Sequence, residues 1–268
     1  MNKRYIGALI LAPLIVFLFL GGDYLKYLVM LLSLFGMYEL YKVSRKKHYK
    51  PIGLVGYILC VVYYVNMGND FSSSFNVYIL IAAILLLLCI PIFHTNYNFV
   101  DIALTIFGFL YVAVFFSFIV FINNKTYGGY LVWIIFICSW GCDTAAYYSG
   151  RILGKGGKHK LCPKVSPNKT IEGSIGGLLG SAIGCTIYGY VISQYGVPIE
   201  LYHYFVIGIV CGIFGQFGDL IASSIKRFVG AKDYSNLIPG HGGILDRFDS
   251  ILFVSVVAFY YITFVLKI

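Results

Sequence analysis

Long apolar segments alternate with short polar ones along almost the whole chain. A helix needs roughly 20 mostly apolar residues to cross a bilayer, and nine segments meet that need as predicted spans. They are 5–20, 25–41, 52–67, 75–93, 99–122, 129–149, 173–193, 202–225 and 248–266. The pattern therefore predicts an all-α, polytopic integral membrane protein with about nine transmembrane helices, forming a single membrane domain over residues 1–268.

The composition agrees with this pattern. The chain is 59% hydrophobic, has a mean hydropathy of +0.83 and contains only 12% charged residues. A soluble domain carries roughly 25% charged residues, so an ordinary globular enzyme is excluded. The first segment resembles a signal peptide but lacks a small-residue cleavage site, and we interpret it as a retained helix. Seven scattered cysteines are interpreted as packing residues.

Glycines recur at four-residue spacing in the later spans, for example at Gly176, Gly180 and Gly184. Small residues at this spacing let membrane helices approach closely, which predicts a tight helical bundle. The same feature is compatible with a homodimer but does not require one.

The distribution of Lys and Arg predicts the orientation of the spans. With the N-terminus inside, only Lys26, Lys125 and Lys267 of the 20 basic residues fall in outside segments. This assignment places both long polar loops, 150–172 and 226–247, on the cytoplasmic side of the cell membrane. Glu39 and Asp101 lie near predicted span ends, and we interpret both as interfacial.

The densest cluster of charge lies between the last two predicted spans, from Ser223 to Asp249. Charges are costly next to lipid, so such a cluster is a functional-site hypothesis. Helical spacing places four residues on one stripe: Gln216, Asp219, Ser223 and Lys226 or Arg227. Asp219 is therefore either a buried partner for Arg227 or, together with Asp246, a ligand for Mg²⁺, which proteins hold through one or two carboxylates.

A glycine-rich turn, Pro239-Gly-His-Gly-Gly243, lies within this cluster. Glycines let the backbone approach a phosphate, and successive N–H groups can form an anion-binding nest. Basic residues flank the turn, so we interpret it as a triphosphate cradle. Two alternative roles stay open for His241: it either contacts phosphate or caps the turn.

The other long loop, 150–172, is basic, and Ser166-Pro-Asn-Lys-Thr-Ile-Glu-Gly173 forms its end and the start of the next span. The simplest interpretation of the loop is an orientation signal or a contact with anionic lipid. Its end also places two hydroxyls, a lysine and a glutamate at the mouth of a glycine-rich span. The chain has no G-x-x-x-x-G-K-[ST] motif, so a P-loop is excluded.

The polar stretch resembles the signature of the phosphatidate cytidylyltransferases, also called CDP-diacylglycerol synthases. In outline that signature reads S-x-x-K-R-x-x-x-x-K-D-x-x-x-x-x-P-G-H-G-G-x-x-D-R-x-D, and residues 223–249 match nearly every fixed position. The match covers about one tenth of the chain. Two further segments are similar to the family, S-P-x-K-T-x-E-G at 166–173 and D-[ST]-x-A-Y at 143–147.

The resemblance implies roles for the matching residues. It implies that Asp219 and Asp246 bind the catalytic metals and that Lys169 contacts substrate phosphate. With Lys226 and Arg227, these residues form the expected catalytic set. The expected substrate-binding residues are Asp143, Ser166, Thr170, Glu172, Ser223, Lys232, Asp233, His241, Gly242, Gly243, Arg247 and Asp249.

The resemblance implies that Asp143 lines the same cavity as the other site residues. It also implies that Ser166 and Thr170 bind phosphate or metal. Two roles stay open for Glu172, which either orders Lys169 or faces the nucleotide.

The resemblance implies a nucleotidyl transfer in which CTP and phosphatidate give CDP-diacylglycerol and pyrophosphate, in phospholipid biosynthesis. Residues 1–122 then supply N-terminal spans, and 123–268 supply the catalytic spans with their two cytoplasmic loops. The expected cofactor is Mg²⁺, and whether a monovalent cation joins it is left open. The expected partners are CTP, phosphatidate and the lipid bilayer, with no nucleic acid.

Two other functions remain open. A CTP-dependent polyprenol kinase would use a similar phosphate site but would transfer the γ-phosphoryl group. A cation-coupled transporter would use Asp143, Asp219 and Asp246. Transporters place their charges near the bilayer midplane, whereas here the charges gather at the cytoplasmic ends of the predicted spans, which favours phosphate chemistry.

Overall fold

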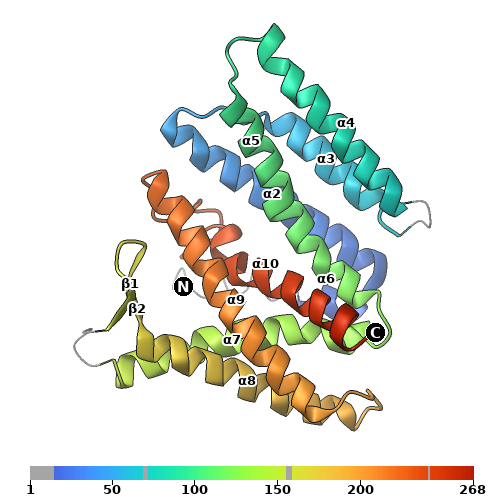
Figure 1. Ribbon diagram of the computed structural model, residues 1–268, viewed down its shortest axis with the longest axis vertical. Helices are drawn as coiled ribbons and strands as arrows, with labels where there is room; N and C mark the ends of the chain where they lie inside the picture. The colour runs from blue at the N-terminus through green and yellow to red at the C-terminus, as the bar shows by residue number, and fades with distance from the viewer. Residues whose placement is uncertain (1–14, 69–71, 155–158, 241) are drawn as a thin grey trace. The chain divides into compact units, whose positions relative to one another are not determined.

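The computed structural model describes residues 15–68, 72–154, 159–240 and 242–268, and most of these residues are helical (Figure 1). The chain divides into two compact units. The first combines Met1–Ser117 with Val229–Asp246, and the second combines Phe118–Phe228 with Arg247–Ile268. The loop that carries the predicted phosphate cradle therefore belongs to the same unit as the N-terminal helices.

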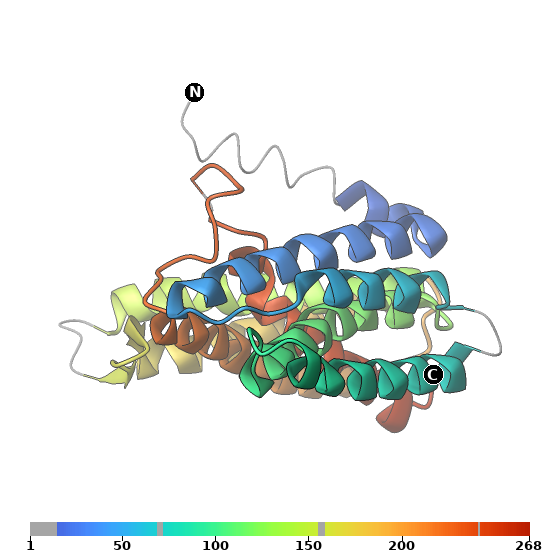
Figure 2. The same cartoon turned by 90° about the horizontal axis from the view of Figure 1, so that it is seen from above.

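The first unit is built from helices and one long loop. The loop runs from the end of α9 to the start of α10 without regular secondary structure (Figure 2). The elements are α2 (Gly22–Ser44), the 3₁₀ turn η1 (Arg45–Lys47), α3 (Gly53–Val65), α4 (Ser72–Phe93), α5 (Phe99–Gly108) and the π-helical segment η2 (Phe109–Val114).

Tyr41 of α2 forms the centre of the packing in this unit. Its ring is 1% exposed, and its hydroxyl donates a hydrogen bond of 2.7 Å to the Thr105 carbonyl on α5. A Cβ atom at Gly108 would lie 2.3 Å from the Tyr41 ring, and one at Gly56 would lie 2.4 Å from its hydroxyl. Glycine at these two positions is what lets α3 and α5 close on the tyrosine.

The second unit contains the remaining helices. Helix α6 crosses the boundary after its third residue, and α10 crosses it after its second residue. The elements are α6 (Phe115–Asn123), α7 (Gly128–Ile152), β1 (Lys160–Cys162), β2 (Ser166–Thr170), α8 (Ile171–Ser193), α9 (Leu201–Phe228), α10 (Leu245–Tyr260) and the π-helical segment η3 (Tyr261–Val265).

Glycines on α8 and α9 bring three helices of this unit into close contact, as the spacing predicts. A Cβ atom at Gly180 would lie 2.2 Å from the Ala145 Cβ on α7, and one at Gly208 would lie 2.7 Å from the Ala182 Cα on α8. The prediction of a tightly packed bundle is confirmed for α7, α8 and α9.

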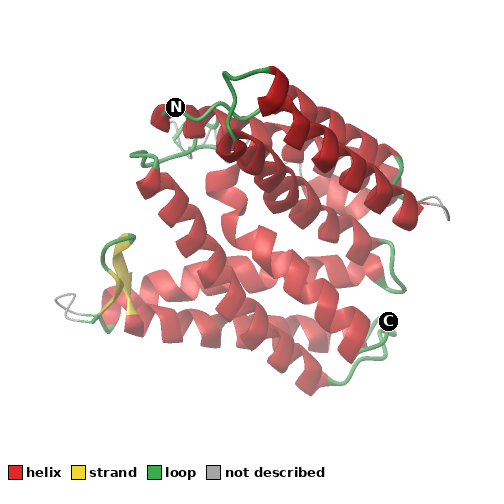
Figure 3. Cartoon of the chain, turned by 45° about the horizontal axis from the view of Figure 1, so that its top comes forward, coloured by secondary structure: helices red, strands yellow, loops and turns green. Residues whose placement is uncertain are grey.

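The 150–172 loop contains structure that the sequence pattern does not indicate. Strands β1 and β2 form an antiparallel hairpin in which Lys160 pairs with Thr170 and Cys162 with Ser166 (Figure 3). The hairpin leads directly into α8. It therefore holds Ser166, Lys169 and Thr170 at the entrance of that helix.

The helical prediction is confirmed, whereas the count of nine spans is not. Among the described residues, five helices are long and apolar enough to cross a membrane: Phe99–Asn123, Gly128–Ile152, Ile171–Ser193, Leu201–Phe228 and Leu245–Val265. The predicted spans 52–67 and 75–93 coincide with shorter apolar helices, Gly53–Val65 and Val77–Phe93. In α2, charges such as Lys26 and Glu39 lower the hydropathy. Most of the predicted span 5–20 lies outside the described residues.

Candidate active site

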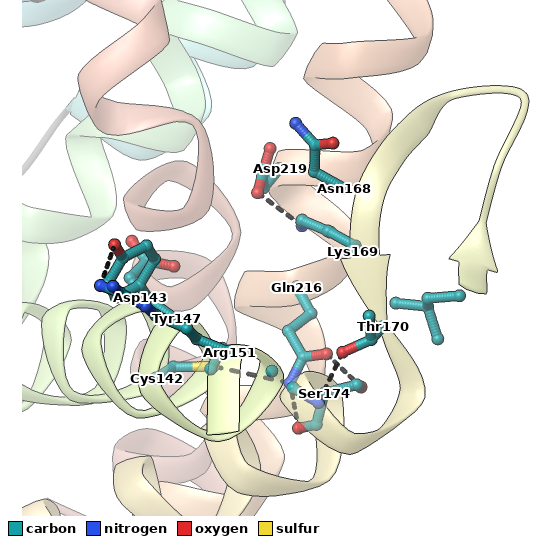
Figure 4. A pocket seen from close by; sticks show the side chains of 14 residues that line it. Cys142, Asp143, Tyr147, Arg151, Asn168, Lys169, Thr170, Ser174, Gln216 and Asp219 are labelled. Atoms are coloured by element: carbon teal, nitrogen blue, oxygen red, sulfur yellow. Dashed lines mark hydrogen bonds and ion pairs between the residues drawn. The ribbon is translucent and has the colours of Figure 1, made fainter. Parts of the chain in front are cut away.

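A pocket of about 490 Å³ opens in the second unit at the end of α7, beside the β-hairpin (Figure 4). Its walls come from α7, the hairpin, the start of α8 and the last turns of α9. The lining residues are Cys142, Asp143, Ala146, Tyr147, Gly150, Arg151, Leu161, Asn168, Lys169, Thr170, Gly173, Ser174, Gln216 and Asp219. The segment that contains Asp143, the segment 166–173 and the part of α9 around Asp219 thus meet around one cavity.

Small residues allow these walls to meet. A Cβ atom at Gly150 would lie 3.1 Å from the Thr170 Oγ1, and one at Gly173 would lie 2.9 Å from the Ala146 carbonyl oxygen. The end of α7 therefore packs directly against the start of α8. This contact brings Asp143 on α7 to the same pocket as Lys169 on the hairpin.

An ion pair joins Lys169 to Asp219 across the pocket. The Lys169 Nζ lies 2.5 Å from the Asp219 Oδ2, and the two side chains are 26% and 31% exposed (Figure 4). The Ser223 hydroxyl, one turn further along α9, donates to the Asp219 Oδ1 at 3.3 Å. The predicted stripe on α9 is confirmed for Asp219 and Ser223, and Asp219 forms an ion pair with Lys169 of the hairpin.

Thr170 caps the helix that begins at the pocket. It has extended backbone geometry, and its Oγ1 accepts a hydrogen bond of 3.1 Å from the Gly173 N–H. This bond satisfies one of the amides left without an intrahelical partner at the start of α8. Thr170 lines the pocket and is 8% exposed. Its predicted contact with phosphate or metal stays a prediction.

Gln216 ties α9 to the first turn of α8. Its Nε2 donates to the Ser174 carbonyl at 3.0 Å, and the Ser174 hydroxyl donates to the Gln216 Oε1. The reciprocal pair fixes the amide of Gln216 at the floor of the pocket, one turn before Asp219. Helical spacing places Gln216 on the stripe of Asp219, but the sequence gives no sign that Ser174 is its partner.

Acidic and basic side chains gather around Asp219 in the second unit. The negative charge of Asp219 repels the carboxylates of Asp143 and Asp249. Arg247 offsets the charge of Asp143, and Lys226 offsets that of Asp249. These three acids and the two basic residues therefore interact with one another electrostatically.

Seven predicted residues of the second unit do not line the pocket: Ser166, Glu172, Ser223, Lys226, Arg227, Arg247 and Asp249. Ser166 lies on β2, opposite Cys162. The Glu172 Oε1 lies 2.6 Å from the Nδ1 of His159, and the two expected roles of Glu172, ordering Lys169 or facing the nucleotide, stay predictions. The Arg227 Nε donates to the Val165 carbonyl at 3.4 Å, which holds α9 against the turn of the hairpin.

Asp246 belongs to the first unit, where it fixes the loop before α10. Its Oδ2 accepts the N–H groups of Tyr234 at 2.8 Å and Gly243 at 2.9 Å. A Cβ atom at Gly242, whose φ is +80°, would lie 3.0 Å from the same oxygen. The loop is thus folded around this carboxylate, and the N–H of Gly243 points at Asp246.

The remaining predicted residues of this loop lie apart from those contacts. Lys232 and Asp233 line a second pocket of about 430 Å³ in the first unit, together with Lys42 and Lys46 of α2 and η1. His241 lies outside the described residues.

The donor set around Asp219 fits Mg²⁺, the metal implied by the sequence resemblance. Mg²⁺ prefers oxygen ligands, above all carboxylates. The mutual repulsion of Asp143, Asp219 and Asp249 is what a bound divalent cation would offset. Among the residues that the structure describes, however, no three His, Cys, Asp or Glu side chains form a ready metal site.

Comparison with known proteins decides the family. The model of the cytidylyltransferase family matches residues 2–265. The chain belongs to this family. A phosphatidate cytidylyltransferase of Staphylococcus haemolyticus is 35% identical over 251 residues, which cover 93% of this chain and 92% of the relative. The enzyme of that name from Bacillus subtilis is 33% identical over 263 residues, covering 95% and 94%. That from Staphylococcus aureus is 34% identical over 261 residues, covering 95% and 96%.

Several pocket residues of this family member are not among the predicted site residues. Asn168, Tyr147 and Arg151 line the cavity, and the Arg151 Nη1 donates to the Tyr147 hydroxyl at 3.4 Å. Asn168 occupies the variable position of S-P-x-K-T, so the motif does not single it out. Tyr147 and Arg151 follow Asp143 at helical spacing, and that periodicity was the available signal.

Proposed function

We propose that this chain forms CDP-diacylglycerol and pyrophosphate from CTP and phosphatidate, as a step of phospholipid biosynthesis. The names of its relatives and the match to the cytidylyltransferase family support the reaction. The structural observation that carries the proposal is the pocket in which Lys169 and Asp219 face one another. A lysine and a carboxylate that face one another in a pocket suit a polyphosphate and its counter-ion.

In the proposed reaction, a phosphate oxygen of phosphatidate attacks the α-phosphorus of CTP. The bond from that phosphorus to the oxygen that bridges the α- and β-phosphates breaks, and pyrophosphate leaves with this oxygen. Phosphatidate is already an anion, so no strong general base is needed. The barrier comes mainly from repulsion between anions and from alignment, as in other phosphoryl-transfer reactions.

The basic side chains are proposed to offset that repulsion. Lys169 lies at the pocket wall, and its ammonium would bind a phosphate oxygen in place of, or together with, Asp219. Lys226 is 8% exposed, so its charge acts in a poorly hydrated environment where electrostatic interactions are strong. Arg227, fixed to the hairpin turn through Val165, is proposed to complete the set.

We further propose that Asp219 and Asp246 hold Mg²⁺. When bound, Mg²⁺ neutralises phosphate oxygens of the nucleotide. Asp219 lines the pocket, and Asp246 is fixed by two backbone donors, so both carboxylates have defined orientations. Whether a monovalent cation binds as well is a separate question for the same assay.

The substrates suggest where the protein works. The apolar helices support a membrane protein, and the bacterial relatives support the cell membrane. We propose that phosphatidate enters from the bilayer and CTP from the cytoplasm, because the distribution of Lys and Arg favours polar loops on that side. A homodimer is compatible with this arrangement, and the reaction does not depend on it.

The test is turnover of radiolabelled CTP by the purified protein in detergent, with phosphatidate and Mg²⁺. The wild type should form CDP-diacylglycerol, and Asp219→Asn and Asp246→Asn should reduce its formation strongly while the proteins remain folded. Omitting Mg²⁺ should have the same effect. A folded wild-type protein that forms no CTP-dependent product with any lipid would refute the proposal and direct attention to ion-flux assays.

A further inference from the structure

A carboxylate from α2 holds the loop that precedes α10. The side chain of Glu39 is 1% exposed, although the sequence suggests an interfacial position. Its Oε1 accepts the Ser235 hydroxyl at 2.5 Å and the Ile244 N–H at 2.9 Å. Its Oε2 accepts the Leu245 N–H at 2.9 Å. All four residues belong to the first unit.

The energetics favour a negative charge at this position. A buried carboxylate is costly unless hydrogen-bond donors compensate for the lost water, and three donors do so here. One of them is the amide of Leu245, the first residue of α10, and another is the amide just before it. Amides at a helix start lack intrahelical partners, and the helix dipole attracts negative charge there. Glu39 therefore caps α10 from another helix.

Gly243 is enclosed by this carboxylate on one side and by Asp246 on the other. A Cβ atom at Gly243 would lie 2.5 Å from the Glu39 Oε2 and 2.6 Å from its Oε1. The Gly243 N–H donates to the Asp246 Oδ2 at 2.9 Å. The last glycine of the predicted phosphate cradle is thus held between an acid of α2 and an acid of α10.

We propose that Glu39 is a positioning residue for Gly243, the last glycine of the predicted cradle, and for Asp246. It acts through its charge, which orients the amides before and at the start of α10, and not through contact with substrate. The proposal rests on the proposed function, in which this loop and Asp246 act on CTP. It assigns a role in the reaction to α2, a helix outside the motif segments 143–147, 166–173 and 223–249.

The chain offers a matched pair of variants. Glu39→Gln keeps the shape of the side chain but replaces one acceptor oxygen by an N–H₂ group, which would face a backbone donor. Asp101→Asn makes the same change at another buried acid of the first unit. Asp101 is 1% exposed and accepts the N–H groups of Lys50 at 2.6 Å and Asn98 at 2.9 Å, both of which lie outside the loop before α10.

Two measurements separate positioning from general stability. Glu39→Gln should lower kcat/KM for CTP by about 10- to 100-fold per folded molecule, as loss of a supporting hydrogen-bond partner does at other sites. It should also speed hydrogen exchange at the amides of Ile244 and Leu245. Asp101→Asn should change neither quantity per folded molecule, whatever it does to thermal stability. Ser235→Ala removes one donor to Glu39 and should give a smaller effect in the same direction.

The outcomes decide between the alternatives. Equal losses of activity in Glu39→Gln and Asp101→Asn would show a purely structural role and overturn the proposal. Unchanged exchange at Ile244 and Leu245 would overturn it as well. If Glu39→Gln does not fold, Ser235→Ala decides by the same two measurements. If the wild type makes no CDP-diacylglycerol, the proposed function fails, and hydrogen exchange alone still tests whether Glu39 fixes the loop.

Discussion

Replacing Lys169 by Met should separate the role of its charge in catalysis from its role in stability. The substitution keeps most of the length of the side chain and removes the ammonium that lies 2.5 Å from the Asp219 Oδ2. Both side chains are about a quarter to a third exposed, so solvent screens the pair, and its loss should cost about 1 kcal/mol of stability. Such a change leaves most of the protein folded.

The catalytic effect should be much larger. A positive group fixed where negative charge accumulates is worth about 10²–10³ in rate, or about 2.7–4 kcal/mol of transition-state stabilisation. Lys169→Met should therefore lower kcat with phosphatidate and CTP by this factor. The assay is the rate of CDP-diacylglycerol formation at saturating CTP, corrected for the folded fraction from size-exclusion chromatography in detergent.

Lys164→Met is the matched control, because Lys164 is exposed in the turn of the same hairpin and does not line the pocket. The control should keep the wild-type rate. A Lys169→Met protein that turns over at nearly the wild-type rate would refute the reasoning, since the charge at the pocket wall would then have no part in the reaction.

Three further predictions concern the same framework. Asp219→Asn should abolish the response of the rate to added Mg²⁺, measured as the rate against Mg²⁺ concentration; a wild-type response would contradict its role as a ligand. Gly180→Val should prevent folding, because a Cβ atom there would lie 2.2 Å from the Cβ of Ala145. Gly184→Ala should be tolerated, since a Cβ atom there would lie 3.6 Å from its nearest neighbour, Ile137. The yield of monodisperse protein tests both, and an equal yield of the two variants would contradict the prediction. Tyr41→Phe removes one of the two hydrogen bonds that the Thr105 carbonyl accepts, the other coming from the Phe109 N–H, and should cost about 0.5–1.5 kcal/mol, seen as a lower Tm without loss of activity per folded molecule.

The helices of the second unit could be predicted because membrane-spanning segments carry a strong compositional signal. The predicted spans 129–149, 173–193 and 202–225 lie within α7, α8 and α9. The glycine spacing also predicted how closely these helices pack. Motif resemblance then placed Asp143, Lys169, Thr170 and Asp219 in one cavity, and the structure brings them to one pocket.

Features that depend on tertiary contacts could not be predicted in this way. The hairpin at 160–170 has strands of three and five residues, too short for a pattern to distinguish from a loop. The partner of Lys169 is 50 positions away at Asp219, and no local spacing links the two. Glu39 lies near a predicted span end, which suggests water, but the loop before α10 folds over it and buries it.

The most direct test of the central claim follows two labelled forms of CTP into the lipid. Purified wild-type protein in detergent, with phosphatidate and Mg²⁺, is given CTP labelled at either the α- or the γ-phosphorus, and the lipid fraction is counted. The account predicts that the α-label enters the lipid as CDP-diacylglycerol and that the γ-label leaves as pyrophosphate. Transfer of the γ-label to a lipid alcohol, with no α-label in the lipid, would contradict it and identify a lipid kinase.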